Sequence, residues 1–202
     1  MDFGLIFSLQ VPPGSGIPWQ EPYQDMLTCL PRAEELGYTS SFQVSHHAQK
    51  DGLCPGPLVA CAGAAAVTNT MRIGTGVLLV PLYAPLKLAE DVVVLDNLSN
   101  GRFIFGVAPG YVASEFEAHG IPREERIGRF EEALDLMTIA WTEETFSFNG
   151  KYFKVPETRL TPRPVQNPHP PIWYGVSAPG SLRRAARRNA IQIMSPRHGP
   201  EE

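Results

Sequence analysis

The sequence lacks an excess of charge of either sign and is poor in cysteine. Its 202 residues carry 17 Lys and Arg against 21 Asp and Glu, a formal net charge of -4 at pH 7. This balance gives no support to nucleic-acid binding, and the basic cluster RRAARR at 183–188 has the spacing of a solvated helix face. Cys29, Cys54 and Cys61 form no CxxC pair. They indicate neither a disulfide framework nor a zinc site, and they favour a reducing, cytoplasmic setting.

Long apolar runs and targeting signals are also lacking. No apolar stretch approaches membrane-spanning length. The first residues, MDFGLIFSLQ, have neither a basic region ahead of the apolar ones nor a small-residue cleavage site. With 43% hydrophobic and 19% charged residues, the composition is that of an ordinary globular protein. We therefore expect a soluble protein without a membrane partner.

Short apolar runs alternate with helical patterns along the chain. The strand-like runs cover 3–9, 40–45, 72–80, 102–108, 171–176 and 191–195, and the helical patterns cover 23–37, 55–68, 86–101, 124–141 and 181–189. Asn149-Gly150 predicts a hairpin over 145–155, and Pro31 predicts a kink or a late start of the first helix. Such alternation is typical of parallel strands covered by helices. Two architectures fit, an open doubly wound sheet and a (β/α)₈ barrel, and both place the ligand at the strands' carboxyl ends.

Two adjacent histidines, His46 and His47, end the strand-like stretch FQVSHH. Histidine titrates near neutral pH, so a pair at a strand end is suited to proton transfer. The alternative is structural, with one ring bonded to a backbone carbonyl and the other facing water. A metal site is not favoured, because no nearby HxH, cysteine or carboxylate completes a ligand set.

Glycines mark three further strand ends. GTGVLLVP (74–81) has two glycines inside a strand, which often indicates that a ligand approaches closely, or else a bulge or barrel corner. A flat ring lying against Gly76 and Val77 is the sharper interpretation, since the stretch matches no phosphate-loop motif. GVAPGY (106–111) and GVSAPGS (175–181) stand at the ends of the next two strand-like runs. The second leads into a helix and suits an anion, although Ser181 is also an ordinary helix-capping residue.

Nearly the whole chain is covered by four runs that resemble one family: ELGYTSSFQVSHH, RIGTGVLLVPLYAPLKLAEDVVVLDNLSNGRFIFGVAPGY, FEAHGIPREERIGRFEEAL and RLTPRPVQNPHPPIWYGVSAPGSLRRAARR. They resemble the bacterial luciferase-like flavin monooxygenases, and their combination is far more specific than any single run. The resemblance implies a (β/α)₈ barrel that binds reduced FMN, or alternatively a deazaflavin coenzyme. It implies O₂ and a small organic molecule as substrates, a separate flavin reductase as partner, and a homo-oligomer. A deazaflavin-dependent dehydrogenase and a non-catalytic flavin-binding barrel are the alternatives.

The same resemblance assigns site residues. His46 matches the histidine that handles protons near the flavin, and Gly76 and Val77 match a non-prolyl cis peptide behind the flavin ring. The residues expected to bind the cofactor are Thr75, Gly76, Val77, Gly110, Tyr111, Arg126, Ser177 and Ser181. Among them, Tyr111 walls the pocket, and Ser177 and Arg126 match phosphate contacts.

The sequence departs from the family in three respects. Ser45 stands where the family usually has a glutamate, so an orienting carboxylate is missing there, and Pro109 replaces a phosphate-binding arginine of the luciferases. Family chains are also much longer. We therefore expect residues 1–202 to form a single barrel domain that lacks the last strands and is marginally stable, prone to self-association and weak in flavin binding. Its inward faces are expected to include Leu5 and Phe7 or their neighbours at one edge, and Ile191 and Ile193 or their neighbours at the other.

Overall fold

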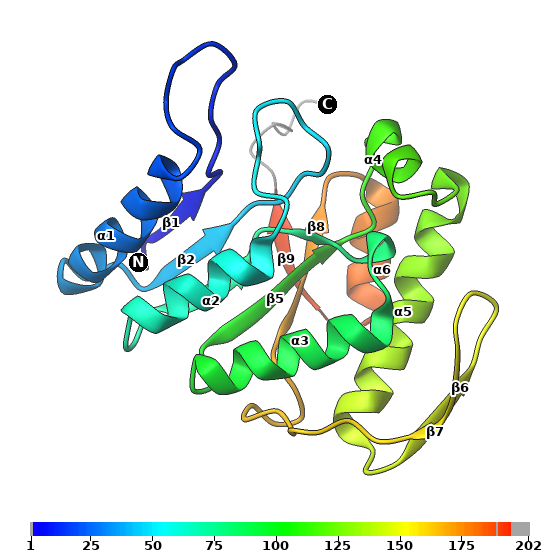
Figure 1. The fold of residues 1–202 in the computed structure, drawn as a ribbon. Helices are drawn as coiled ribbons and strands as arrows, with labels where there is room; N and C mark the ends of the chain where they lie inside the picture. Colours follow the sequence, from blue (N-terminus) through cyan, green and yellow to red (C-terminus); the bar gives the residue numbers. More distant parts are fainter. Residues whose placement is uncertain (1, 189, 195–202) are drawn as a thin grey trace.

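A curled sheet of parallel strands forms the centre of the molecule (Figure 1). This computed structural model describes residues 2–188 and 190–194. The strands of the sheet are β1 (Gly4–Phe7), β2 (Ser40–Gln43), β3 (Arg72–Thr75), β4 (Leu78–Leu79), β5 (Phe103–Ala108), β8 (Ile172–Val176) and β9 (Ile191–Met194). Their order is β1-β2-β3-β5-β8-β9, with β4 paired to β5. The described residues thus form an incomplete barrel wall, as the sequence predicts.

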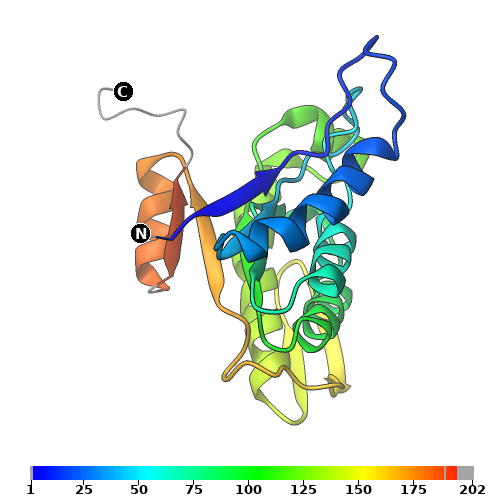
Figure 2. The same cartoon turned by 90° about the vertical axis from the view of Figure 1, so that its left-hand side faces the viewer.

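Helices cover the convex side of this wall (Figures 1 and 2). They are α1 (Glu21–Glu35), α2 (Pro57–Val67), α3 (Pro85–Leu98), α4 (Ala113–Ala118), α5 (Arg126–Thr142) and α6 (Pro179–Arg187), with 3-10 turns η1 (Val80–Leu82) and η2 (Arg123–Glu125). The core lies between helices and sheet, where Phe130, Leu134 and Trp141 of α5 are buried. The Trp141 indole Nε1 donates to the Ala89 carbonyl at 3.1 Å and so joins α5 to α3. No helix among these residues is long and apolar enough to cross a membrane.

Most predicted elements are present, with three differences. Helix α1 runs from Glu21 through Pro31, so the late start is wrong. The predicted strand 72–80 is interrupted after Thr75, and the short helix α4 was not predicted. The hairpin of β6 (Phe146–Asn149) and β7 (Lys154–Thr158) is confirmed, with 150–153 as its loop.

Strand register decides which side chains face the concave side of the sheet. Leu5 and Phe7 of β1 pack with the helix-facing core, so these two do not point inward, and the expectation holds for their neighbour Ile6 instead. Ile6, between them, points the other way and is 68% exposed. Successive residues of a strand alternate between faces, whereas paired residues of neighbouring strands share one. The concave row therefore continues from Ile6 through its register partners Phe42, Gly74 and Ile104.

The far half of the concave face is also apolar. Trp173 of β8 pairs with Gly106 and with Ile191, and Gly175 pairs with Ile193, so both isoleucines face inward as expected. The Trp173 ring stacks on Phe42 with 5.6 Å between ring centroids. Within the described residues, β1 and β9 each pair on one side only. Marginal stability and self-association stay predictions.

The loops at the rim where strands begin are held by buried or half-buried charges. Glu34, at the end of α1, accepts backbone N–H bonds from Asn69, Thr70 and Met71 at 2.6–3.1 Å. Partial burial by itself would raise its pKa, but these hydrogen bonds hold the pKa of Glu34 at about 2. The carboxylate therefore fastens α1 to the loop that leads into β3.

Two further side chains act in the same way at this rim. Asp96 of α3 accepts the N–H groups of Val165 (2.7 Å) and Gln166 (3.0 Å), just ahead of β8. Arg102, just ahead of β5, donates to four carbonyl oxygens, those of Ala65, Thr68, Met71 and Ser99. Peptide groups that would otherwise be unpaired are thus satisfied by charged side chains.

We expect Glu34→Gln to lower the free energy of unfolding by about 1.5 kcal/mol, the usual cost of hydrogen bonds to a charged group. Its neighbour Glu35 pairs only with Arg32 on the surface, so Glu35→Gln is a matched control with an expected loss below ~0.5 kcal/mol. Because the folded-state pKa of Glu34 is depressed, its contribution is present above the ordinary value of 4.5 and is lost as the pH falls towards about 2. Urea titrations between about pH 3 and about pH 7 measure both effects. Equal losses in the two variants would contradict the assignment.

Candidate functional site

Four neighbouring strands, β2, β3, β5 and β8, end at one rim, and each leads into residues that the sequence singles out. They are His46 after β2, Thr75, Gly76 and Val77 at the end of β3, Gly110 and Tyr111 after β5, and Ser177 and Ser181 after β8. This is the rim where parallel α/β folds carry their ligands. Arg126, the remaining predicted site residue, is the first residue of α5.

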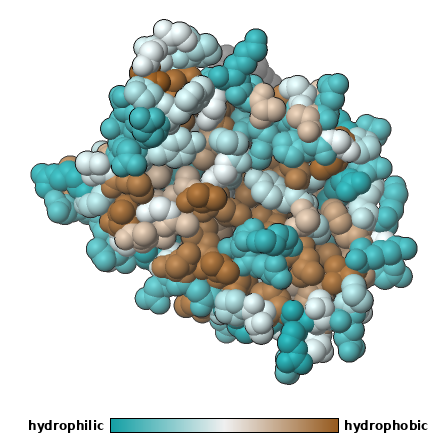
Figure 3. All heavy atoms as spheres, in the orientation of Figure 1, coloured by the Kyte–Doolittle hydropathy of each residue, from teal (hydrophilic) through white to brown (hydrophobic). Residues whose placement is uncertain are grey.

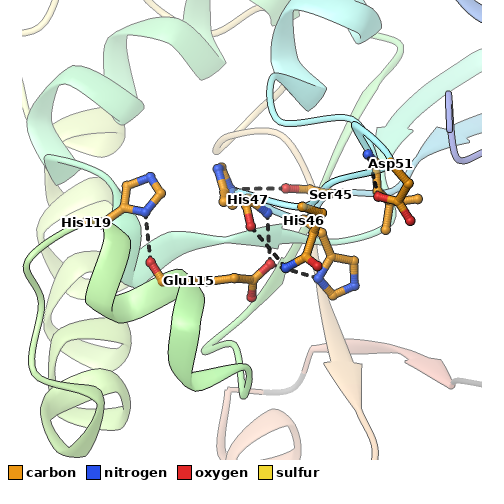
Figure 4. Close-up of polar contacts among 8 residues, drawn as sticks. Ser45, His46, His47, Asp51, Glu115 and His119 are labelled. Atoms are coloured by element: carbon orange, nitrogen blue, oxygen red, sulfur yellow. Dashed lines mark hydrogen bonds and ion pairs between the residues drawn. The ribbon is translucent and has the colours of Figure 1, made fainter. Parts of the chain in front are cut away.

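His46 is joined to a buried carboxylate (Figure 4). Its Nδ1 lies 2.8 Å from Oε1 of Glu115, whose side chain is fully buried, while the His46 side chain keeps 28% of its surface exposed. The same Oε1 accepts the backbone N–H of His47 at 2.8 Å. A histidine ring that is fixed by a carboxylate through one nitrogen and open at the other is suited to accept or donate a proton.

His47 occupies a different environment. Its ring is buried, with Nε2 3.3 Å from the Ser45 hydroxyl and with the rings of Tyr83 and His119 edge-on at 6.0 and 5.0 Å. Burial first, and the nearby His119 next, lower the pKa of His47, so this ring is neutral at pH 7. The structural alternative for the pair is therefore wrong in detail, because among the described residues neither ring is bonded to a carbonyl.

The break in the third strand lies at the Gly76-Val77 peptide, which is cis as the resemblance implies. A Cβ added at Gly76 would lie 3.1 Å from the Phe42 Cβ on the concave face, so the glycine leaves room there. The Thr75 hydroxyl is buried and donates to the Gly106 carbonyl at 2.6 Å. Thr75 thus holds β3 to β5 through its side chain.

The turn after β5 brings an aromatic ring towards His46. Gly110 has a φ of 74°, a conformation that side chains other than glycine rarely adopt. Tyr111, 62% exposed, places its ring edge-on to that of His46 at 6.4 Å between centroids. Arg123 Nε donates to the Tyr111 carbonyl at 3.1 Å, and Arg126 Nη1 donates to the Arg123 carbonyl at 3.1 Å. Within the part of the chain that the structure describes, Arg126 is therefore linked to the site only through the backbone of this segment.

Ser177 and Ser181 have distinct positions at the start of α6. Ser181 is buried, and its hydroxyl oxygen accepts the N–H groups of Ser177 and Ala178, each at 3.1 Å. It donates in turn to the Ala178 carbonyl at 2.7 Å. These contacts are those of a helix-capping residue. Ser177, by contrast, is exposed.

The family model described as luciferase-like monooxygenase matches residues 1–202. The chain belongs to this family. It is 30% identical over 183 residues to the oxygenase component of the flavin-dependent trigonelline monooxygenase of Acinetobacter baylyi, covering 89% of this chain and 51% of that protein.

Two solved structures of luciferase-like proteins have the same fold. Monooxygenase RslO1 from Streptomyces bottropensis superimposes with a TM-score of 0.90 and 32% identity, over 99% of this chain and 61% of that one. The oxygenating constituent of 3,6-diketocamphane monooxygenase from Pseudomonas putida, in complex with FMN, gives 0.85 and 25%, over 96% and 57%. The chain spans about half the length of the curated relatives that it matches.

One residue of this luciferase-like site, Glu115, is missing from the sequence-based prediction. The lack of a glutamate at Ser45 indicates that no carboxylate orients the histidines, but Glu115 of α4, 69 residues after His46, takes that place. The only signal in the sequence is an acidic residue beside an apolar one, Phe116, in a short segment between two glycines. By itself that signal is not specific.

The lining of the concave face indicates whether a flavin ring can bind there. Phe42, Val77 and Trp173 give this face an apolar, aromatic lining. Glycines keep side chains out of the places where neighbouring segments approach closely, since a Cβ added at Gly175 would lie 3.2 Å from the Val77 side chain. Flat apolar surfaces with few polar groups are typical of cofactor sites. Within the described ranges, no three His, Cys, Asp or Glu side chains gather as a metal-ligand set. The residues present fit the flat ring of a flavin.

Proposed function

We propose that this chain acts as a flavin-dependent monooxygenase that uses reduced FMN and O₂ to oxygenate a small organic molecule. The observation that supports this most is the shared rim, where the His46–Glu115 pair lies at the end of β2 and Gly76 at the end of β3. The relatives named above as flavin-dependent and FMN-bound monooxygenases support the choice of cofactor.

Each part of the rim has a role in this proposal. The flavin, when bound, supplies the electrons and the site at which O₂ reacts. The apolar concave face, with Phe42 and Trp173, receives the ring and excludes water. The ring nitrogen Nε2 of His46 accepts or donates a proton beside the flavin. Ser177 binds the phosphate through its hydroxyl, while Ser181 shapes the helix start that holds Ser177 in place.

The test is a binding and turnover experiment on the purified chain. Titration with FMN and, separately, with a deazaflavin coenzyme is followed by absorbance and fluorescence. FMN binding with O₂ consumption, when a flavin reductase and NADH are supplied, supports the monooxygenase. Binding of the deazaflavin alone supports a dehydrogenase instead, and binding of neither supports a non-catalytic barrel.

The proposal includes a separate flavin reductase as partner, because the trigonelline relative is named as the oxygenase component of its enzyme. It also includes a cytoplasmic location, which the three free thiols Cys29, Cys54 and Cys61 support. Burial raises the pKa of the Cys54 and Cys61 thiols, so both are unreactive packing groups.

A homo-oligomer is the last part of the proposal. Apolar side chains gather on the surface over α2 and α3 (Figure 3). Val59 of α2 is 79% exposed, and Val94 and Leu98 of α3 are also exposed. Exposed apolar patches of this kind often mark interaction sites.

We expect Val59→Lys to shift the protein towards the monomer, because the charge would have to be buried at the interface. Leu182→Lys on α6, another exposed apolar position, is the matched control and should leave the oligomeric state unchanged. Light scattering after size exclusion measures both. A parent that is monomeric at every concentration would contradict this part of the proposal.

A further inference from the structure

Among the described residues, the Glu115 side chain forms hydrogen bonds only with His46 and His47. This side chain is fully buried, which is costly for a carboxylate unless it is paired. Oε1 receives both bonds, from the His46 ring and from the His47 backbone, whereas Oε2 has no partner among the described residues. The burial of Glu115 therefore serves only the His46–His47 segment.

The donors at Oε1 determine where the proton of the His46 ring lies. A carboxylate oxygen accepts hydrogen bonds, so Nδ1 must carry a proton to donate at 2.8 Å. A neutral ring that is protonated at Nδ1 has its lone pair at Nε2. This nitrogen lies on the side of the ring away from Glu115 (Figure 4).

We infer that Glu115 is a positioning residue, which holds His46 as the Nδ1–H tautomer and so directs the Nε2 lone pair to the exposed side of the ring. The carboxylate lost at Ser45 is thereby replaced from α4. The tautomer itself does not depend on what the protein catalyses. Its consequence for turnover rests on the proposed flavin chemistry, because only there does Nε2 act on a bound group.

The same contact also anchors the segment, since the His47 N–H bonds to Oε1. Two substitutions test the role of this acceptor oxygen. Gln at position 115 keeps an oxygen that accepts from both His46 and His47. Ala removes every acceptor, so that the His46 ring no longer has a reason to keep its proton on Nδ1.

The experiment is ¹⁵N NMR of the histidine rings in the flavin-free protein, at a pH about 1.5 units above the ordinary imidazole value of about 6.5. We expect Nδ1 of His46 to be protonated in the parent and in Glu115→Gln. In Glu115→Ala we expect the proton to move to Nε2. Glu117→Ala, which truncates an exposed carboxylate of the same helix, is the control and should resemble the parent. An unprotonated Nδ1 in the parent overturns the inference without any variant.

Turnover with reduced FMN provides the second measurement. Loss of the orienting carboxylate is expected to lower it by ~10–100-fold in Glu115→Ala, the range known for partners that orient a functional histidine. Glu115→Gln should recover most of this loss. Parent turnover in a folded Glu115→Ala protein whose tautomer has changed would overturn the consequence. Flavin turnover absent from the parent, with the expected tautomer, would refute the proposed function and leave the placement of the proton intact.

Discussion

Replacing His46 with alanine is expected to lower turnover by ~10²–10⁴-fold, the usual contribution of a general acid or base, while the protein remains folded. The side chain lies at a strand end and is partly exposed, so its removal leaves little packing unfilled. Steady-state turnover with a reductase and reduced FMN measures the effect, and thermal unfolding verifies the fold.

The matched control for His46 is His119→Ala. His119 belongs to the same group of rings, but it is exposed and its Nδ1 bonds the Glu115 carbonyl of its own helix. Its loss should change turnover less than ~10-fold, since it has no role in proton transfer here. A His46→Ala protein that binds flavin and turns over like the parent would remove His46 from the chemistry. His47→Ala should chiefly reduce stability, because that ring is buried.

Replacing Gly76 with leucine is expected to weaken flavin binding by on the order of 100-fold or more, equivalent to about 3 kcal/mol of lost affinity. The new side chain would extend from a point 3.1 Å from the Phe42 Cβ into the concave face that the ring would occupy. Fluorescence titration with FMN measures the dissociation constant.

Gly56→Leu is the control for this substitution. Gly56 has a φ of -123°, and the nearest atom to an added Cβ is 3.8 Å away, so a side chain fits without strain. Thermal unfolding of both variants separates a lost site from a lost fold. A folded Gly76→Leu protein with the parent's affinity would exclude the end of β3 from the flavin site.

The order of strands and helices could be predicted because each element carries its own pattern. Apolar runs such as 102–108 and the one-sided helix 124–141 are local signals, and the structure places β5 and α5 on them. The end of β3 could not be predicted in the same way. The run RIGTGVLLV is apolar throughout, so nothing in its periodicity indicates that the strand stops at Thr75.

The candidate site could be predicted only in part. Residues that follow strands directly, such as His46 and Gly76, were found because the fold class places all strand ends on one rim. Glu115 was not, since its partner is 69 residues away and its helix of six residues is too short for a period to show. The faces of β1 were misjudged for a related reason. Apolar residues at Leu5, Ile6 and Phe7 leave the alternation between the two sides unreadable.

The two rims of the sheet differ in how readily their loops can be exchanged or lengthened. Where strands begin, Glu34, Asp96 and Arg102 bind peptide groups of neighbouring loops, so those loops are fixed in length and course. Where strands end, a charged side chain of loop 48–53, Asp51, binds a peptide group of its own loop, the Leu53 N–H, and the side chain of Gln10. Evolution, or a protein engineer, can therefore exchange or lengthen loops at the second rim to change which molecules are accepted. The first rim would keep the sheet together while the specificity changes.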